Sequence, residues 1–258
     1  PWAQHTYRWY AYDTVSKAVV YCARMTVRAG DEVLLDEDPA KAFRYEPKEH
    51  GYWTWVYEPV ARRLHPPSFG RPFKNSWGLC LTPTPRGIYA LTRQQLYRAK
   101  VAEGRVSWTL LDDQGPKRPR GYSYEFLPVV YDSKRERLIH CMGKKETVDV
   151  YARGLADGAA WERLPTQGTV AIGREAAYIA RHDCVLMLGG SGRLFVLECP
   201  SNRWRELDVT LPKGRYGTES AMVYDPRHDV AVLLIPARFS GPLQTVLFRL
   251  DPKTARYR

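Results

Sequence analysis

The sequence has no long apolar stretch, few cysteines and no long amphipathic helical pattern. Because a membrane-spanning helix needs about 20 consecutive apolar residues, the sequence predicts no membrane span. The cysteines lie far apart and include no CxxC pair, so we expect neither a disulfide framework nor a zinc site but small buried side chains. They are Cys22, Cys80, Cys141, Cys184 and Cys199. Their odd number slightly favours a reducing compartment, and the localisation stays open.

Nucleotide-binding and nucleophile motifs are missing as well. The sequence contains no GxGxxG, GxSxG or Walker-type phosphate loop. The glycine-rich segment 188–194, LGGSGRL, lies between two apolar runs and therefore predicts a turn between strands, not a strand-to-helix phosphate site. We expect no cofactor and no metal site.

Basic residues exceed acidic ones. Lys and Arg number 39 and Asp and Glu 28, which gives a formal net charge of +11. This excess predicts a general attraction to acidic polymers. The cations are scattered, however, and their densest group, Lys117, Arg118 and Arg120, is interrupted by Pro119, so the sequence does not predict a specific nucleic-acid site.

An aromatic residue recurs along the chain at intervals of 53, 53, 43 and 53 residues. Its positions are Trp55, Trp108, Trp161, Trp204 and Tyr257. Each closes a passage in which an alternating apolar run, a polar turn and a second apolar run predict a β-hairpin. A second hairpin lies upstream of each, with tyrosines at equivalent points just before four of its turns: Tyr12, Tyr131, Tyr178 and Tyr224.

Two hairpins in each unit predict four antiparallel strands, repeated five times. The units cover approximately residues 2–57, 75–111, 121–164, 170–207 and 215–258. Four-stranded sheets that repeat every 40 to 50 residues or so are typical of β-propeller blades. We therefore predict an all-β fold with one β-propeller domain over residues 1–258. The Pro- and Arg-rich segments 61–74 and 112–122 are expected to connect blades.

One unit carries a family resemblance. The segment 185–190, VLMLGG, is followed by an apolar run at 194–197 and by Trp204, and this order resembles a kelch repeat. The triplet VYD at 130–132 and 223–225 is similar to the first strand of that family. The resemblance implies a ring with a central channel and a bias toward binding, but it implies no reaction. Because kelch-like rings commonly have six or seven blades, either five blades close a small ring or the chain is part of a larger one.

Charged residues gather at one level of the predicted channel. Alignment of the units on the recurring tyrosines places four charged residues near one mouth of the channel: Arg8, Glu125, Arg174 and Glu219. They are the candidate binding residues, although mutual pairing of these mixed-sign charges in a hydrated channel is the favoured interpretation. Four tryptophans lie off the aromatic rhythm and are the candidate recognition residues, Trp2, Trp9, Trp53 and Trp77, with Trp9 and Trp77 assigned to the binding site, whereas those on the rhythm are expected to pack between blades.

The most enzyme-like group is His5, Tyr7 and Arg8 at the start of the first blade. A His or Tyr base beside an Arg that neutralises a carboxylate suits β-elimination from an acidic polysaccharide. A copper radical site like that of galactose oxidase, whose propeller is also kelch-like, is not predicted, because its ligands cannot be placed at one blade mouth. His182 and His228 occupy equivalent turns, and His140 is expected to make a core or channel contact.

These observations predict a non-catalytic binding or scaffolding propeller that contacts a protein partner, within a larger protein or assembly. Its longer loops, including residues 24–40, would form the contact surface. The alternative is a carbohydrate-active propeller, either a lectin-like binder or a lyase acting on an acidic polysaccharide.

Overall fold

The computed structural model describes residues 2–4, 10–26, 52–65, 79–92, 94–116, 128–144, 147–171, 173–214, 216, 220–237 and 242–249. All regular structure within these ranges is β-strand, and none of them forms a helix that could cross a membrane. The chain divides into two compact units, Pro1–Gly115 and Pro116–Arg258.

The first unit holds two antiparallel sheets. Sheet 1 consists of β1 (Trp2–Gln4), β2 (Tyr10–Asp13), β3 (Ala18–Thr26), β4 (Tyr52–Glu58) and β5 (Arg63–Leu64). Strands β1 and β2 pair with different stretches of β3, so together they occupy the position of one strand. Sheet 2 consists of β6 (Cys80–Thr84), β7 (Gly87–Thr92), β8 (Gln95–Ala102) and β9 (Arg105–Asp112).

The second unit holds three more sheets. Sheet 3 consists of β10 (Val129–Asp132), β11 (Arg137–Lys144), β12 (Thr147–Gly154) and β13 (Glu162–Leu164). Sheet 4 consists of β14 (Gly173–Ile179), β15 (Cys184–Gly189), β16 (Leu194–Glu198) and β17 (Arg203–Glu206). Sheet 5 has three strands within the described residues, β18 (Ala221–Asp225), β19 (Val230–Pro236) and β20 (Leu243–Phe248).

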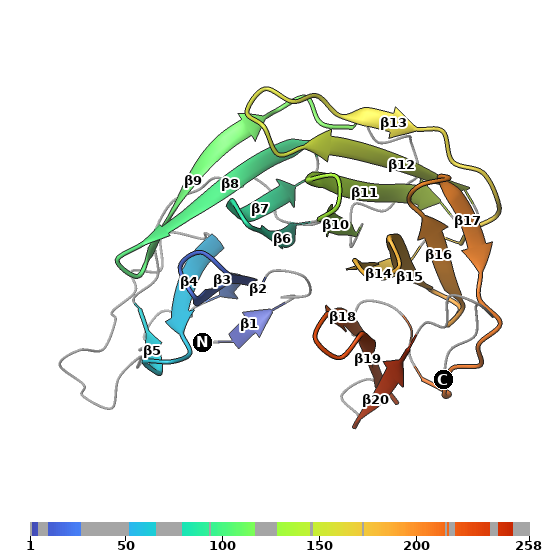
Figure 1. Cartoon of the computed structure of the whole chain (residues 1–258). Coiled ribbons are helices and arrows are strands. Elements are labelled where there is room, and N and C mark those ends of the chain that lie inside the picture. Colours follow the sequence, from blue (N-terminus) through green and yellow to red (C-terminus); the bar gives the residue numbers. More distant parts are fainter. Residues whose placement is uncertain are drawn as a thin grey trace. The chain divides into compact units, whose positions relative to one another are not determined.

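The predicted β-propeller fold is confirmed. Apart from the split first strand of sheet 1, each strand pairs with its neighbour in sequence, as in a propeller blade. Within the second unit, the first strands β10, β14 and β18 lie side by side on the inner side of their sheets, and β13 and β17 lie on the outer side (Figure 1). The tyrosines used to align the units occupy equivalent positions, because each stands second to last in its first strand: Tyr12, Tyr131, Tyr178 and Tyr224.

Two details of the first blade were predicted wrongly. Trp55 lies on β4, which pairs with both β3 and β5, so it is on the third strand and not on the closing one. The fourth strand is β5, which falls inside the segment expected to be a connector. In sheets 2, 3 and 4 the prediction holds better, because Trp108 and Trp204 lie on the fourth strands β9 and β17, and Trp161 directly precedes β13. Tyr257, the closing aromatic of the fifth unit, lies outside the described residues.

Apolar clusters hold neighbouring sheets together. One joins sheets 1 and 2, a second joins sheets 3 and 4, and a third joins sheets 4 and 5. Strand β15 is buried at all six positions because Val185 and Met187 face the second cluster while Leu186 and Leu188 face the third. All five cysteines are buried and free, as predicted, and burial raises the pKa of Cys22, Cys184 and Cys199 to about 12.

Aspartates fix the turns between the first and second strands. Asp13, Asp132 and Asp225 each end a first strand, and each accepts backbone N–H bonds from the residues two and three positions ahead. Such side-chain bonds replace part of the backbone pairing that a turn gives up. The last turn residue has a positive φ each time, 59° at Lys17, 47° at Glu136 and 54° at Asp229.

Candidate functional site

Most of the residues predicted to bind or catalyse lie outside the described part of the chain. These are His5, Tyr7, Arg8, Trp9, Trp77, Glu125 and Glu219. Most of the loop 24–40 also lies outside it. Their proposed roles therefore stay predictions.

Arg174 is the one predicted channel-mouth residue whose backbone is described, and the recognition candidates Trp2 and Trp53 lie on β1 and β4. Arg174 lies on β14 at a bulge, because Gly173 pairs with Gly189 and Glu175 with Leu188, so Arg174 has no partner across the ladder. The next residue, Glu175, is buried and accepts the backbone N–H of Met222 in sheet 5 at 3.3 Å, which ties two neighbouring first strands together.

The predicted structural histidines lie where the sequence placed them. His140 is buried on β11, its Nδ1 lies 3.3 Å from the Pro128 carbonyl oxygen, and its ring meets Trp161 edge-on. His182 and His228 occupy the third position of equivalent turns, where His182 lies 3.4 Å from Asp229 and His228 contacts Asp225. Within the described ranges, no group of three or more His, Cys, Asp or Glu side chains could hold a metal ion.

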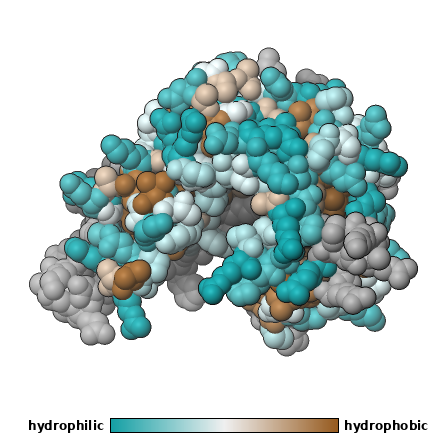
Figure 2. Space-filling model, viewed as in Figure 1, coloured by the Kyte–Doolittle hydropathy of each residue, from teal (hydrophilic) through white to brown (hydrophobic). Residues whose placement is uncertain are grey.

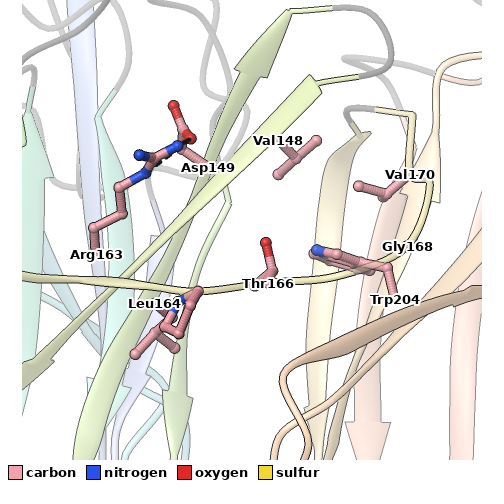
Figure 3. A pocket seen from close by; sticks show the side chains of 9 residues that line it. Val148, Asp149, Arg163, Leu164, Thr166, Gly168, Val170 and Trp204 are labelled. Atoms are coloured by element: carbon pink, nitrogen blue, oxygen red, sulfur yellow. Dashed lines mark hydrogen bonds and ion pairs between the residues drawn. The ribbon is translucent and has the colours of Figure 1, made fainter.

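A pocket opens between sheets 3 and 4, inside the second unit (Figure 3). Its volume is about 460 Å³, within the usual range for ligand sites. Residues of β12 and β13, the linker to sheet 4 and β17 line it: Val148, Asp149, Arg163, Leu164, Pro165, Thr166, Gly168, Val170 and Trp204. We call this site the Trp204 pocket.

The linker that forms one wall is fixed to the edge of sheet 4. The backbone N–H of Gln167 donates to the Asn202 carbonyl at 3.0 Å, and the N–H of Trp204 donates back to the Gln167 carbonyl at 2.7 Å. Gly168 follows with a φ of 92°, and a Cβ there would lie 2.4 Å from the Trp204 carbonyl oxygen. Only glycine fits so close an approach at this φ, so the wall is held before any ligand arrives.

Trp204 carries a buried hydrogen-bond donor beside the pocket. Its ring is 3% exposed and packs in the cluster between sheets 3 and 4, as the sequence predicted. Its indole Nε1 is nevertheless buried without a hydrogen-bond partner. Figure 3 shows this nitrogen at the edge of the ring that faces Thr166. Because an unpaired buried N–H is costly, this donor favours an acceptor placed in the pocket.

An ion pair stands at the pocket wall. Arg163 on β13 donates through Nε to Asp149 Oδ1 on β12 at 3.1 Å, and its Nη2 contacts the same oxygen. The Arg163 side chain is 68% exposed and the Asp149 side chain 14%, so the guanidinium faces solvent and the carboxylate lies beneath it. The opposite charges of Arg163 and Asp149 cancel, so the lining of the pocket carries no net charge.

The pocket therefore combines a mostly polar lining with a few aliphatic side chains. Val148, Leu164 and Val170 suit a small apolar group, while the Trp204 N–H and the Thr166 hydroxyl suit a carbonyl. The face of the indole is covered, so it cannot serve as a stacking platform for a sugar ring.

The sequence analysis did not single out Asp149, Arg163 or Thr166. The opposite charges of Asp149 and Arg163 on neighbouring strands were a usable signal, but the pairing register is needed to see that they meet. No protein-family model matches this sequence, and no curated protein is similar enough to count as a match.

Proposed function

We propose that this chain is a kelch-like, non-catalytic binding propeller that recognises a protein partner through the Trp204 pocket. The observation that carries the proposal is the buried, unpartnered indole N–H of Trp204 beside a pocket that combines polar groups with aliphatic side chains. A backbone carbonyl of an extended segment satisfies this donor, and a small aliphatic side chain fills the space beside Val148 and Val170. The kelch-like character is supported by Gly189 and Gly190 at the end of β15 and by Trp204 on the closing strand.

Preorganisation supports binding at this site. Two backbone hydrogen bonds and the close approach of Gly168 hold the linker wall in place, so a ligand does not have to order it. Figure 2 shows the visible face of the molecule as mostly hydrophilic, with hydrophobic residues in small separate groups. Recognition on such a surface depends on local pockets and a few polar groups more than on one broad apolar patch.

The test uses peptides selected from a random library on the purified protein. Trp204→Phe keeps an aromatic side chain at this position but removes the N–H together with part of the indole ring, so peptides that use the pocket should bind at least about 3- to 10-fold more weakly, as one lost hydrogen bond implies. Thr166→Val should weaken the same peptides to a similar degree. Isothermal titration calorimetry measures both effects.

Trp108→Phe is the matched control, because Trp108 closes sheet 2 and donates its N–H to Thr54 at 3.4 Å within the protein. It should leave peptide affinity unchanged. Equal affinities for the wild type and Trp204→Phe would contradict the proposal. Binding of an acidic glycan that depends on Trp204, with no peptide selected, would favour the carbohydrate alternative, to which the net charge of +11 is suited.

A further inference from the structure

Three turns of the second unit form a repeating series. They join the first and second strands of sheets 3, 4 and 5, they cover residues 133–136, 180–183 and 226–229, and each has four residues. The last residue of each has a similar positive φ, 47° at Glu136, 52° at Asp183 and 54° at Asp229. Residues at the same place in these turns are therefore structurally equivalent. We call them the first turns.

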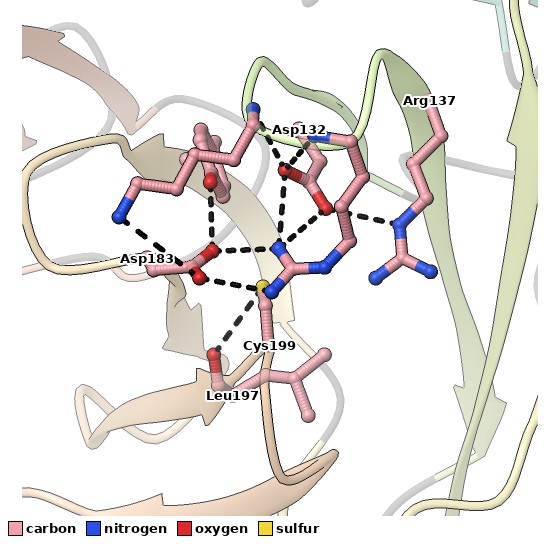
Figure 4. Close-up of polar contacts among 8 residues, drawn as sticks. Asp132, Arg137, Asp183, Leu197 and Cys199 are labelled. Carbon is pink, nitrogen blue, oxygen red and sulfur yellow. Dashed lines mark hydrogen bonds and ion pairs between the residues drawn. The ribbon is translucent and has the colours of Figure 1, made fainter.

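Ion pairs connect each first turn to the next. Arg135 donates through Nη1 and Nη2 to the two carboxylate oxygens of Asp183, at 2.7 and 2.9 Å (Figure 4). Arg181 Nη1 lies 3.3 Å from Asp229 Oδ2, which repeats the connection one sheet further on. The first turns consequently lie next to one another, and their exposed side chains form one continuous row.

The solvent-facing side of this row is basic. The second position of each turn carries a cation, Lys134, Arg181 or Arg227, and all three are exposed, Arg181 to 70%. The carboxylates that pair across the row are covered by comparison, since the side chains of Asp183 and Asp229 are 15% and 12% exposed.

Two carboxylates of the row are accessible. Glu136 is exposed at the sheet 3 end, and Asp225 is 40% exposed but holds its own turn and contacts His228. An approaching partner therefore meets a cation on each turn and a carboxylate near each end of the row.

We propose that Lys134, Arg181 and Arg227 form a docking row for an extended acidic segment of a protein partner. Packed sheets lie about 10 Å apart, so we expect successive cations of the row to be spaced at about that distance. An extended chain rises about 3.4 Å per residue, so every third residue of the partner meets a cation. The row takes a segment with carboxylates at positions i, i+3 and i+6. It is a second surface, separate from the Trp204 pocket, and does not depend on that pocket.

The experiment compares two synthetic nine-residue peptides of identical composition. One carries Glu at positions 1, 4 and 7, and the other carries Glu at positions 1, 2 and 3, both in a Ser and Thr background. Fluorescence anisotropy at low salt should show at least about 5-fold tighter binding of the spaced peptide, and added salt should weaken it because the charges are exposed.

Substitutions in the row test whether the spaced peptide binds there. Arg181→Gln and Arg227→Gln should each weaken the spaced peptide about 3- to 5-fold, Arg181→Lys should retain most of the affinity, and Glu136→Gln should strengthen it. Arg193→Gln is the matched control. Arg193 is 46% exposed and paired with Glu206, but its turn is at the opposite end of β15. Trp204→Phe should have no effect, which separates this row from the pocket.

Three results would overturn the proposal. Equal binding of the spaced and clustered peptides would indicate attraction to net charge alone. An equal loss in Arg193→Gln would remove the row as the location. A heparin-like polysaccharide that binds through Arg181 more tightly than the spaced peptide would assign the row to a carbohydrate.

Discussion

At the scale of single residues, His140 is a buried titratable group without a charged partner described for it. Its side chain is packed on β11 against Trp161, with ring centroids 6.1 Å apart, and its Nδ1 lies 3.3 Å from the Pro128 carbonyl. Burial lowers the pKa of His140 to about 4, and the contact with the Pro128 carbonyl opposes this shift only in part. The folded protein therefore keeps the imidazole neutral well below the ordinary pKa of 6.5.

This burial predicts a loss of stability in mild acid. Between pH 6.5 and about 4 the unfolded chain binds a proton at His140 that the folded chain does not, so the free energy of unfolding falls as the pH drops through this window. Above pH 6.5 the imidazole is neutral in the folded and in the unfolded chain, so His140 no longer makes the free energy of unfolding depend on pH. From pH 7 to pH 5 the wild type should lose about 2 kcal/mol more than His140→Gln, measured by urea unfolding. Parallel losses in the two proteins would contradict this.

At the scale of elements, the linker between β13 and β14 shows how a short segment builds a site. Gly168 combines a φ of 92° with a space that a Cβ cannot occupy beside the Trp204 carbonyl. Gly158 has a similar φ of 77°, but no atom lies within 4 Å of the position that its Cβ would take. A comparison of substitutions at these two glycines therefore separates the effect of steric exclusion from that of backbone strain.

Gly168→Ala should destabilise the protein by about 1 to 3 kcal/mol more than Gly158→Ala. Both substitutions strain the backbone, but only at Gly168 does the added Cβ clash with the Trp204 carbonyl oxygen. Thermal unfolding followed by circular dichroism measures the difference. Gly168→Ala should also weaken peptides that use the Trp204 pocket, since the wall must move. Equal thermal unfolding midpoints for the two variants would show that the linker shifts to accommodate the added Cβ without a loss of stability.

The elements themselves were largely predictable, because alternating apolar residues and turn residues are local signals. Tyr131 and Tyr178 marked equivalent first strands correctly. Trp55 misled the prediction because its spacing matched the other tryptophans, while its place in the sheet depends on the pairing of β4 with β5, which is only two residues long. Such a short strand leaves almost no pattern in the sequence.

The Trp204 pocket was less predictable for a related reason. Its polar groups come from two sheets and a linker, and their meeting depends on tertiary packing between those sheets. Sequence reasoning assigned Trp204 to packing and was right about the ring, but the direction of its N–H follows only from the position of the linker. Arg163 and Asp149 meet through a pairing register that composition cannot supply.

At the scale of the whole molecule, the blades are expected to be coupled mainly to their neighbours. Each apolar cluster joins two consecutive sheets, and sheet 4 contributes to two of them through the opposite faces of β15. In repeat architectures stability is approximately a sum of the units and their nearest-neighbour interfaces. A defect in sheet 4 should therefore spread to sheets 3 and 5 first.

Leu186→Ala tests this coupling. Leu186 is fully buried on β15, so the truncation should cost about 2 to 5 kcal/mol through lost contacts and a cavity. Hydrogen exchange followed by mass spectrometry should show faster exchange in β15 and in its neighbours β11 and β19. Strands β7 and β8 of the first unit, which contains sheets 1 and 2, serve as the internal reference and should keep their protection. If β7 and β8 lose protection as much as β15 does, the blades unfold as one cooperative block and nearest-neighbour coupling is wrong for this protein.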